Sequence, residues 1–319
     1  MTLDKGVHKV LDLCIVGAGP AGVEAALQAD HRSISYVLLD KDIAGSLIER
    51  TMAQKRFFHA YGRNTRVPSG LLEFPDHSLG HELVLCWHKQ LEGKRYIREC
   101  GVQGISVRDG VCTIEAQTRQ YHARYVLLAS GTHETPRTLG VPGEQEHHAS
   151  IVYQFDYGHD YGDGPFVVIG GGNSALETAV EISFDQDVVL VVRKDHFAES
   201  VTDANKADIE ELIKDGRVRV LWQQYVQEIR DDEVIVVHNN TMLTLPFTTL
   251  FVHAGYHTPT TFLAKCGIEL ENEKPVCNEH FQTNVPELFI AGSLAGADSV
   301  VESADQAIAV INYIDTREK

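Results

Sequence analysis

The sequence predicts an α/β fold with two Rossmann-like domains, the second inserted in the first. A glycine-rich loop occurs near the N-terminus and again near the middle of the chain, each time between an apolar segment and a helix-like segment. A second apolar segment follows each unit, as the next parallel strand of a βαβ motif would. The length of 319 residues is sufficient for about two domains with separate cores.

The first loop, GAGPAG, has the pattern of a site for the pyrophosphate of a dinucleotide. It connects apolar residues 11–16 to helix-like residues 23–30. In this pattern Gly17 permits the tight turn, Gly19 lets a pyrophosphate approach the backbone, and Gly22 lets the helix pack on the strand. Free N–H groups at the start of the helix attract the anion. The predicted contacts come from Gly17, Gly19, Pro20, Ala21 and Gly22.

The second loop, GGGNSA, repeats the pattern with a small residue in the last place. Apolar residues 166–169 precede it, and apolar residues 188–192 follow its helix-like segment. The G-x-G-x-x-A form is an accepted variant of the dinucleotide-binding motif. The predicted contacts come from Gly170, Gly172, Asn173, Ser174 and Ala175.

Opposite charges follow the two loops at the same spacing. Asp40 lies 23 residues after Gly17, and Arg193 lies 23 residues after Gly170. A carboxylate there suits a free ribose 2′-hydroxyl, whereas Arg193 and Lys194 suit a 2′-phosphate. The first site therefore predicts FAD or NAD and the second predicts NADPH, which together indicate a flavin reduced by a nicotinamide. The alternative is that Arg193 and Lys194 only end a solvated strand.

Composition and charge weigh against several other classes of function. The net charge of −17 disfavours nucleic acid or an anionic membrane as the main partner. The first residues contain no signal-peptide core, and no apolar segment is long enough to span a bilayer. The six cysteines form neither a Cys-x-x-Cys pair nor a zinc-site spacing, and the histidines form no metal motif. We therefore expect reduced thiols, no metal site and a cytoplasmic protein.

Periodicity and turn residues predict the remaining elements and the domain boundaries. Helices are expected at residues 78–90, 203–215 and 301–314. Strands are expected at residues 96–97, 101–107, 111–116, 125–129, 218–222, 234–238 and 248–252, with a final strand and turn at 285–292. Polar segments at 145–164 and 255–257 predict two crossings between domains. Residues 1–150 and 253–319 are therefore assigned to an FAD-binding domain, and residues 151–252 to an NADPH-binding domain.

Residues 50–66 form a basic segment with interleaved aromatic side chains, including Phe58. Such a pattern is compatible with nucleic-acid binding. The acidic chain as a whole favours another role, and we expect Phe58 to belong to a wall beside the flavin ring.

Several longer stretches together resemble the two-dinucleotide-binding flavoproteins that include low-molecular-weight thioredoxin reductase. These stretches are GAGPAG, YVLLASGTHETPR with VPGE, GGGNSALETA, VVRKDHF and TNVPELFIAG, and they cover essentially the whole chain. Two places depart from the reductases. Residues 153–156 read YQFD where a redox Cys-x-x-Cys would stand, and Ser293 replaces an Asp after the final Ala-Gly. Ordinary thioredoxin reduction is therefore not expected.

The bacillithiol-disulfide reductase (YpdA-type) branch is more similar still. It resembles this chain in RFFH, in AGYHTPTTFL with GIEL, and in TNVPELFIAG without the Asp. The branch carries a reactive cysteine inside the first glycine loop, where this chain has Ala21. The departure removes the thiol for disulfide reduction and leaves the transfer of electrons from NADPH to flavin intact.

The resemblance implies FAD and NADPH as cofactors and adds further contact residues. FAD contacts are expected from Asp40, Lys41, Gly45, Ser46, Phe58, Val102, Ala129, Ser130, Gly131, Gly292 and Ser293. Reduced flavin would pass electrons to a small disulfide, a quinone or an electron-carrier protein, and His257, Tyr256 and His133 are candidates to protonate the acceptor. Two other functions stay open: a ferredoxin- or flavodoxin-NADP reductase, and a nucleotide-binding redox sensor without turnover. We expect a homo-oligomer.

Overall fold

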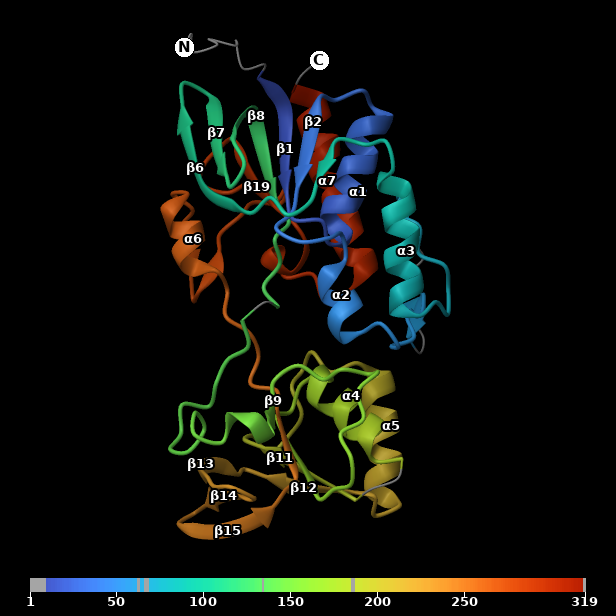
Figure 1. Cartoon of the computed structure of the whole chain (residues 1–319), viewed down its shortest axis with the longest axis vertical. Coiled ribbons are helices and arrows are strands. Elements are labelled where there is room, and N and C mark those ends of the chain that lie inside the picture. The colour runs from blue at the N-terminus through green and yellow to red at the C-terminus, as the bar shows by residue number, and fades with distance from the viewer. Residues whose placement is uncertain (1–9, 62–63, 66–68, 134, 185–186, 318–319) are drawn as a thin grey trace. The chain divides into compact units, whose positions relative to one another are not determined.

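The computed structural model describes residues 10–317, apart from residues 62–63, 66–68, 134 and 185–186. The chain divides into two compact units (Figure 1). Unit 1 contains Met1–His59, Arg66–Glu134 and His257–Lys319, and unit 2 contains Ala60–Thr65 and Thr135–Tyr256. Unit 2 is therefore inserted in the sequence of unit 1.

A seven-stranded mixed sheet forms the centre of unit 1, in the order β5-β2-β1-β8-β7-β6, with β19 also paired to β8. Its strands are β1 (Leu11–Val16), β2 (Tyr36–Leu39), β5 (Tyr96–Ile97), β6 (Val102–Arg108), β7 (Val111–Ala116), β8 (Gln120–Leu128) and β19 (Leu288–Ile290). The pairs of β1 with β2 and with β8 are parallel, whereas β6, β7 and β8 form antiparallel pairs.

Alternate residues of β1 supply two separate cores, because successive strand residues face opposite sides of a sheet. Leu13 and Ile15 pack with the helices α1 and α7, and Cys14 and Val16 pack on the side of β6–β8. The helices of unit 1 are α1 (Pro20–His31), α2 (Ser46–Thr51), α3 (Gly80–Leu91), α6 (Thr260–Lys265) and α7 (Val300–Arg317), with a 3₁₀ turn η2 (Gly292–Ala295). A short hairpin of β17 (Leu270–Glu271) and β18 (Lys274–Pro275) completes this unit.

Unit 2 contains a five-stranded parallel sheet in the order β12-β11-β10-β16-β9 and a separate antiparallel sheet in the order β13-β14-β15. The parallel strands are β9 (Ile151–Val152), β10 (Phe166–Ile169), β11 (Val188–Val192), β12 (Val218–Trp222) and β16 (Thr249–Val252). The antiparallel strands are β13 (Tyr225–Ile229), β14 (Glu233–His238) and β15 (Thr241–Pro246). The helices are α4 (Asn173–Ile182) and α5 (Asp203–Lys214), with the 3₁₀ turn η1 (His148–Ser150) and the pair β3 (Ala60–Tyr61) and β4 (Asn64–Thr65).

Two strands of unit 2 were not expected from the sequence. Only residues 234–238 were predicted as a strand in this region, whereas β13 and β15 pair on either side of β14. Most of β15 is exposed, so its side chains lack the apolar alternation that marks a half-buried strand. A local signal does exist: Asn239 and Asn240 both have positive φ and form the two-residue connection from β14 to β15.

The boundaries of the inserted unit also differ from the predicted ones. Residues 135–150 and 253–256 lie in unit 2, although the sequence analysis placed them in the first domain. The buried Glu144 explains the first difference, because it accepts hydrogen bonds from the N–H of Leu139 and Gly140 and from the Tyr153 hydroxyl. These bonds tie the segment to the start of unit 2.

None of the helices within the described residues has the combination of length and apolar character that crossing a bilayer requires.

Candidate functional site

Close backbone contacts define the shape of the first glycine loop. Gly17 has a φ of +102°, and a Cβ there would lie 2.4 Å from the carbonyl oxygen of Ala129. A Cβ at Gly22 would lie 1.8 Å from the carbonyl oxygen of Gly17. At Gly19, by contrast, no atom of the described residues lies within 4 Å of the Cβ position. Backbone atoms thus approach the first and last glycines of the loop closely, whereas the space beside the middle glycine is open, as a phosphate requires.

The start of helix α1 faces this opening. Gly19 is its N-cap, Pro20 is its first residue, and no side chain caps its N-terminus. An uncapped helix start has unpaired N–H groups and a partial positive charge, which favour an anion. The residues present therefore fit the pyrophosphate of a dinucleotide.

Asp40 follows β2 and is held against the glycine loop by two backbone hydrogen bonds. Its carboxylate accepts from the N–H of Ala18 at 2.5 Å and from the N–H of Asp42 at 2.8 Å. Burial raises the pKa of Asp40, and these two bonds oppose the shift. Each carboxylate oxygen keeps a further lone pair, so the group can still accept a hydrogen bond from a ribose hydroxyl.

Two segments that are distant in the sequence lie at the glycine loop in unit 1, and their residues are among the predicted FAD contacts. A Cβ on Gly292 would lie 3.4 Å from the Cβ of Ala21. The Ser293 hydroxyl accepts a hydrogen bond from the N–H of Thr132 at 3.0 Å, next to Gly131. The glycine loop, residues 129–131 after β8 and residues 292–293 after β19 thus form one continuous edge at the ends of parallel strands, where open α/β sheets bind ligands.

The remaining predicted contacts lie at both flanks of this edge. The N–H of Gly45 donates to the carbonyl oxygen of Ala18 at 2.9 Å, and Ser46 begins α2 directly after it. A Cβ on Gly101, the residue before Val102, would lie 3.4 Å from the Cβ of Lys41. Phe58 packs edge-to-face on His77 with ring centroids 4.9 Å apart, and its place beside a flavin stays a prediction.

The second glycine loop, in unit 2, shares two features with the first: a close backbone contact at its first glycine and open space at its middle glycine. Gly170 has a φ of +144°, and a Cβ there would lie 2.8 Å from the carbonyl oxygen of His253. At Gly172 no described atom lies within 4 Å of the Cβ position. Ala175 is buried and Ser174 is exposed at the start of α4. The middle of this loop is therefore also open toward a phosphate.

The side chain of Asn173 has a structural role that the sequence analysis did not predict. Its Nδ2 donates to the carbonyl oxygen of Ser200, and its Oδ1 accepts from the N–H of Thr202 and from Asn205. These bonds connect the start of α4 to the start of α5. A contact of Asn173 with a nucleotide would therefore come from its backbone.

Arg193 and Lys194 line a polar cavity of about 350 Å³ at the end of β11. Five further residues that the sequence analysis missed line it as well: Asp195, Gln223, Tyr225, His238 and Asn239. The Asp195 carboxylate contacts Nδ1 of His196 at 2.5 Å. The ring of His238 is fixed by two contacts, Nδ1 with the carbonyl oxygen of Gln223 at 2.9 Å and Nε2 with Asn239 at 2.8 Å. Asp195 directly follows Lys194 in the sequence. No sequence motif marks the other four residues, because they reach the cavity only through the fold of β12, β13 and β14.

The three candidate proton donors lie close to the points where the chain passes between the units. His133 precedes the first crossing, Tyr256 ends unit 2, and His257 begins the return to unit 1. Tyr256 is held by Arg137, whose Nε donates to the Tyr256 carbonyl oxygen at 2.9 Å. Their participation in proton transfer stays a prediction.

The family model for pyridine nucleotide-disulphide oxidoreductases matches residues 14–292. The chain belongs to this family. It is accordingly an oxidoreductase, as predicted. Bacilliredoxin reductase Bdr of Bacillus subtilis is 26% identical over 299 residues, which are 90% of this chain and 91% of that protein. A ferredoxin-NADP reductase of Thermus thermophilus is also 26% identical over 299 residues, which are 89% of this chain and 84% of that protein.

Comparison with solved structures confirms the predicted fold class of this family member. Bacillithiol disulfide reductase Bdr (YpdA) from Bacillus cereus superposes with a TM-score of 0.85 at 22% identity, over 97% of this chain and all of that one. The predicted resemblance to the bacillithiol-disulfide reductase branch is thus confirmed by sequence and by structure.

No cysteine of this family member lies in either glycine loop. All six are free, and Cys14, Cys100, Cys112 and Cys266 are buried. Burial raises the pKa of the Cys14 and Cys112 thiols, that of Cys112 to about 12. Since the thiolate is the reactive form, these buried thiols are unsuited to disulfide exchange.

Proposed function

We propose that the protein transfers electrons from NADPH through FAD to an acceptor, without a protein thiol as an intermediate carrier. The observation that carries this proposal is the pair of open glycine loops with opposite charges beside them. Asp40 lies at the first loop, and Arg193 and Lys194 line the cavity at the second. A carboxylate repels a 2′-phosphate and two cations attract it, which assigns FAD to unit 1 and NADPH to unit 2.

The chain's own residues bind and orient the two nucleotides. The N–H groups at the start of α1 hold the FAD pyrophosphate, and Asp40 accepts from its ribose. Gly172 admits the NADPH pyrophosphate, and Arg193 binds the 2′-phosphate with paired N–H donors. When bound, FAD would supply the redox chemistry, which is acceptance of a hydride from NADPH and release of the electrons in a pair or one at a time.

The acceptor is proposed to react with the flavin directly. Ala21 stands in the glycine loop, and residues 153–156 contain no cysteine. A small disulfide would take two electrons and two protons and leave as two thiols. A quinone would leave as a quinol, and a carrier protein would take single electrons.

The test begins with the absorption spectrum of the purified chain. We expect a yellow protein whose flavin band bleaches within seconds when NADPH is added without oxygen, and far more slowly with NADH. A colourless protein that stays colourless after refolding with FAD would contradict the proposal. If NADH and NADPH bleached the flavin band at equal rates, only the proposed binding of the 2′-phosphate by Arg193 and Lys194 would be contradicted.

A ferredoxin- or flavodoxin-NADP reductase is the second candidate function. The similarity to the Thermus thermophilus ferredoxin-NADP reductase and the lack of loop thiols favour it. Steady-state NADPH oxidation with bacillithiol disulfide, a quinone, a ferredoxin or a flavodoxin as the acceptor separates the candidates. NADPH oxidation with any of these acceptors would exclude a sensor without turnover.

A further inference from the structure

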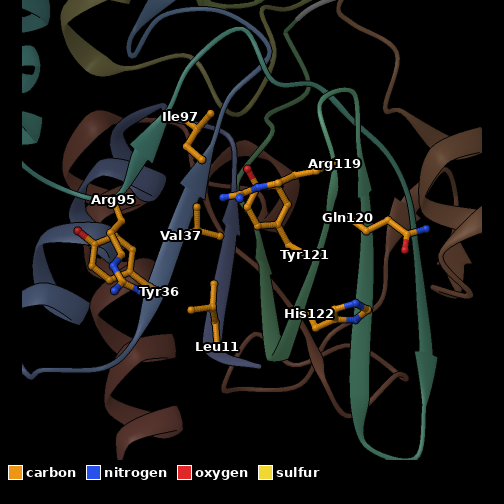
Figure 2. A pocket seen from close by; sticks show the side chains of 9 residues that line it. All are labelled: Leu11, Tyr36, Val37, Arg95, Ile97, Arg119, Gln120, Tyr121 and His122. Atoms are coloured by element: carbon orange, nitrogen blue, oxygen red, sulfur yellow. The ribbon is translucent and has the colours of Figure 1, made fainter. Parts of the chain in front are cut away.

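A cavity of about 390 Å³ lies in unit 1, between the β2–β5 edge of the sheet and the beginning of β8 (Figure 2). Leu11, Val37, Ile97 and Tyr121 line it and belong to the core on the side of β6–β8. Its volume lies within the range of small-molecule sites, which are mostly apolar with a few polar groups. The cavity therefore offers an apolar surface for a ligand.

Two arginines give this cavity a positive charge. Arg95 lines it from the β5 side, and Arg119 from the β8 side (Figure 2). The Arg119 guanidinium carbon lies 4.6 Å from the ring centroid of Tyr121, a cation–π contact that holds it over the apolar lining. No carboxylate is among the described residues that line the cavity.

The two guanidiniums are also free of acidic partners within the described part of the chain. This is notable because Asp and Glu outnumber Lys and Arg by 45 to 28 in the sequence. In a chain so acidic, two exposed arginines around one apolar cavity without a carboxylate favour an anionic ligand from outside the chain.

The cavity does not include the glycine loop, although one lining residue is next to the first nucleotide site: the carbonyl oxygen of Ile97 accepts a hydrogen bond from the N–H of Asp40 at 3.0 Å. Leu11 begins β1 and Val16 ends it, directly before the glycine loop. A strand rises about 3.3 Å per residue, so the two ends lie roughly 16 Å apart. A ligand at Leu11 would therefore leave the glycine loop open.

We propose that this cavity binds an amphiphilic organic anion. Its apolar body covers Leu11, Val37 and Ile97, and its acidic group pairs with Arg119, while Arg95 adds to the positive potential. An apolar body with a single carboxylate or sulfonate fits this combination. A bare inorganic anion would leave the apolar lining uncovered.

Isothermal titration of the full FAD-loaded chain with 1-naphthoate tests the proposal, in the presence of saturating 2′,5′-ADP to occupy the other cationic cavity. We expect one saturable site. Arg119→Gln should weaken binding about tenfold or more, because a charge-assisted hydrogen bond is lost, and Arg95→Gln should weaken it less. The matched control is Arg108→Gln, at the end of β6 and outside the cavity, which should leave the affinity unchanged.

An uncharged ligand and a conservative variant test whether the charge of Arg119 is responsible for binding. The uncharged 1-naphthalenemethanol should bind the wild type and Arg119→Gln equally, and Arg119→Lys should retain part of the naphthoate affinity. Absence of saturable naphthoate binding to the wild type at millimolar concentration would overturn the proposal. Equal affinities of Arg119→Gln and Arg108→Gln would overturn it as well, and so would displacement of naphthoate by excess FAD.

Discussion

Single glycines in the first loop have two different tasks, and substitutions can separate them. Gly22 allows α1 to approach the carbonyl oxygen of Gly17, so it is needed for folding. Gly19 has an ordinary φ of −76° and free space at its Cβ position, so it is needed only by a ligand. Gly22 is thus required for the fold of the chain, and Gly19 is required for binding of the cofactor.

Gly19→Ala should leave the apoprotein as stable as the wild type, within about 0.5 kcal/mol, because the methyl group enters open space. The same methyl group would occupy the place of the pyrophosphate, so FAD affinity should fall strongly. Gly22→Ala should destabilise the apoprotein by more than about 2 kcal/mol, because the backbone must move. Urea unfolding and FAD titration measure the two effects. A Gly19→Ala protein that binds FAD normally would contradict the assigned site.

Arg193→Glu should raise the KM for NADPH about tenfold to a hundredfold and leave the KM for NADH nearly unchanged. The physical reason is that one charge-assisted phosphate contact is lost and a repulsive charge is added. Arg219→Glu is the matched control, since Arg219 is an exposed arginine of β12 that does not line the cavity. Equal effects of the two substitutions would indicate only a general influence of net charge.

Helices in this protein are fastened by buried polar side chains as well as by apolar packing. On α1, the buried Glu24 accepts hydrogen bonds from the N–H of Leu71 and Leu72 and from Gln28. On α4, Thr178 contacts Nε2 of His253 at 2.9 Å, at the end of β16. The contacts with Leu71, Leu72 and His253 each connect a helix to a segment far away in the sequence.

Glu24→Ala should lower the free energy of unfolding by about 3 kcal/mol, because buried N–H groups lose their acceptor. Chemical denaturation of the full chain measures this. Glu49→Ala, an exposed position on α2, is the control and should stay within about 0.5 kcal/mol of the wild type. A similarly small change for Glu24→Ala would show that water replaces the carboxylate without cost.

His253 should make stability depend on pH in a defined window. Burial lowers its pKa to about 4, from the ordinary 6.5. Above pH 6.5 the imidazole is neutral in both states, so its contribution is constant. Between pH 6.5 and about 4 the unfolded chain takes up the proton first, so stability falls by at most about 3 kcal/mol and is constant below. His253→Gln should lose this part of the pH dependence, and parallel curves for both proteins would contradict it.

Elements that depend on local sequence were predictable, and contacts between distant elements were not. The two βαβ units have their signals inside one short stretch, from Leu11 to Leu39 and from Phe166 to Val192. Tyr225 reaches the cavity of Arg193 only because β13 pairs with β14, and Glu144 ties its segment to unit 2 only through Tyr153. Periodicity does not indicate such partners, so the domain boundary and five of the seven residues that line that cavity were not predicted.

At the scale of the whole molecule, each unit has its own sheet and its own hydrophobic cores. The two nucleotides are proposed to bind different units. Each ligand should therefore stabilise one part of the chain, since a ligand stabilises only the fold that binds it.

Calorimetry of the full apoprotein should resolve this as two thermal transitions. Addition of FAD should raise one transition and 2′,5′-ADP the other, each by about 2.7 kcal/mol of stability at a hundredfold excess over its Kd. The Gly19→Ala protein should lose only the FAD response, and Arg193→Glu only the response to 2′,5′-ADP. One transition that both ligands raise together would show that the units unfold as a single cooperative body.

The two ends of the long segment of unit 2, Thr135–Tyr256, are hydrogen-bonded to each other. Pro136 and Tyr256 form an antiparallel bridge, and the N–H of Arg137 donates to the carbonyl oxygen of Gly255 at 2.9 Å. The residues where this segment begins and ends are therefore adjacent in space. A genetic graft of Thr135–Tyr256 would therefore need only two adjacent seams, and it would leave Ala60–Thr65 of unit 2 in the parent chain.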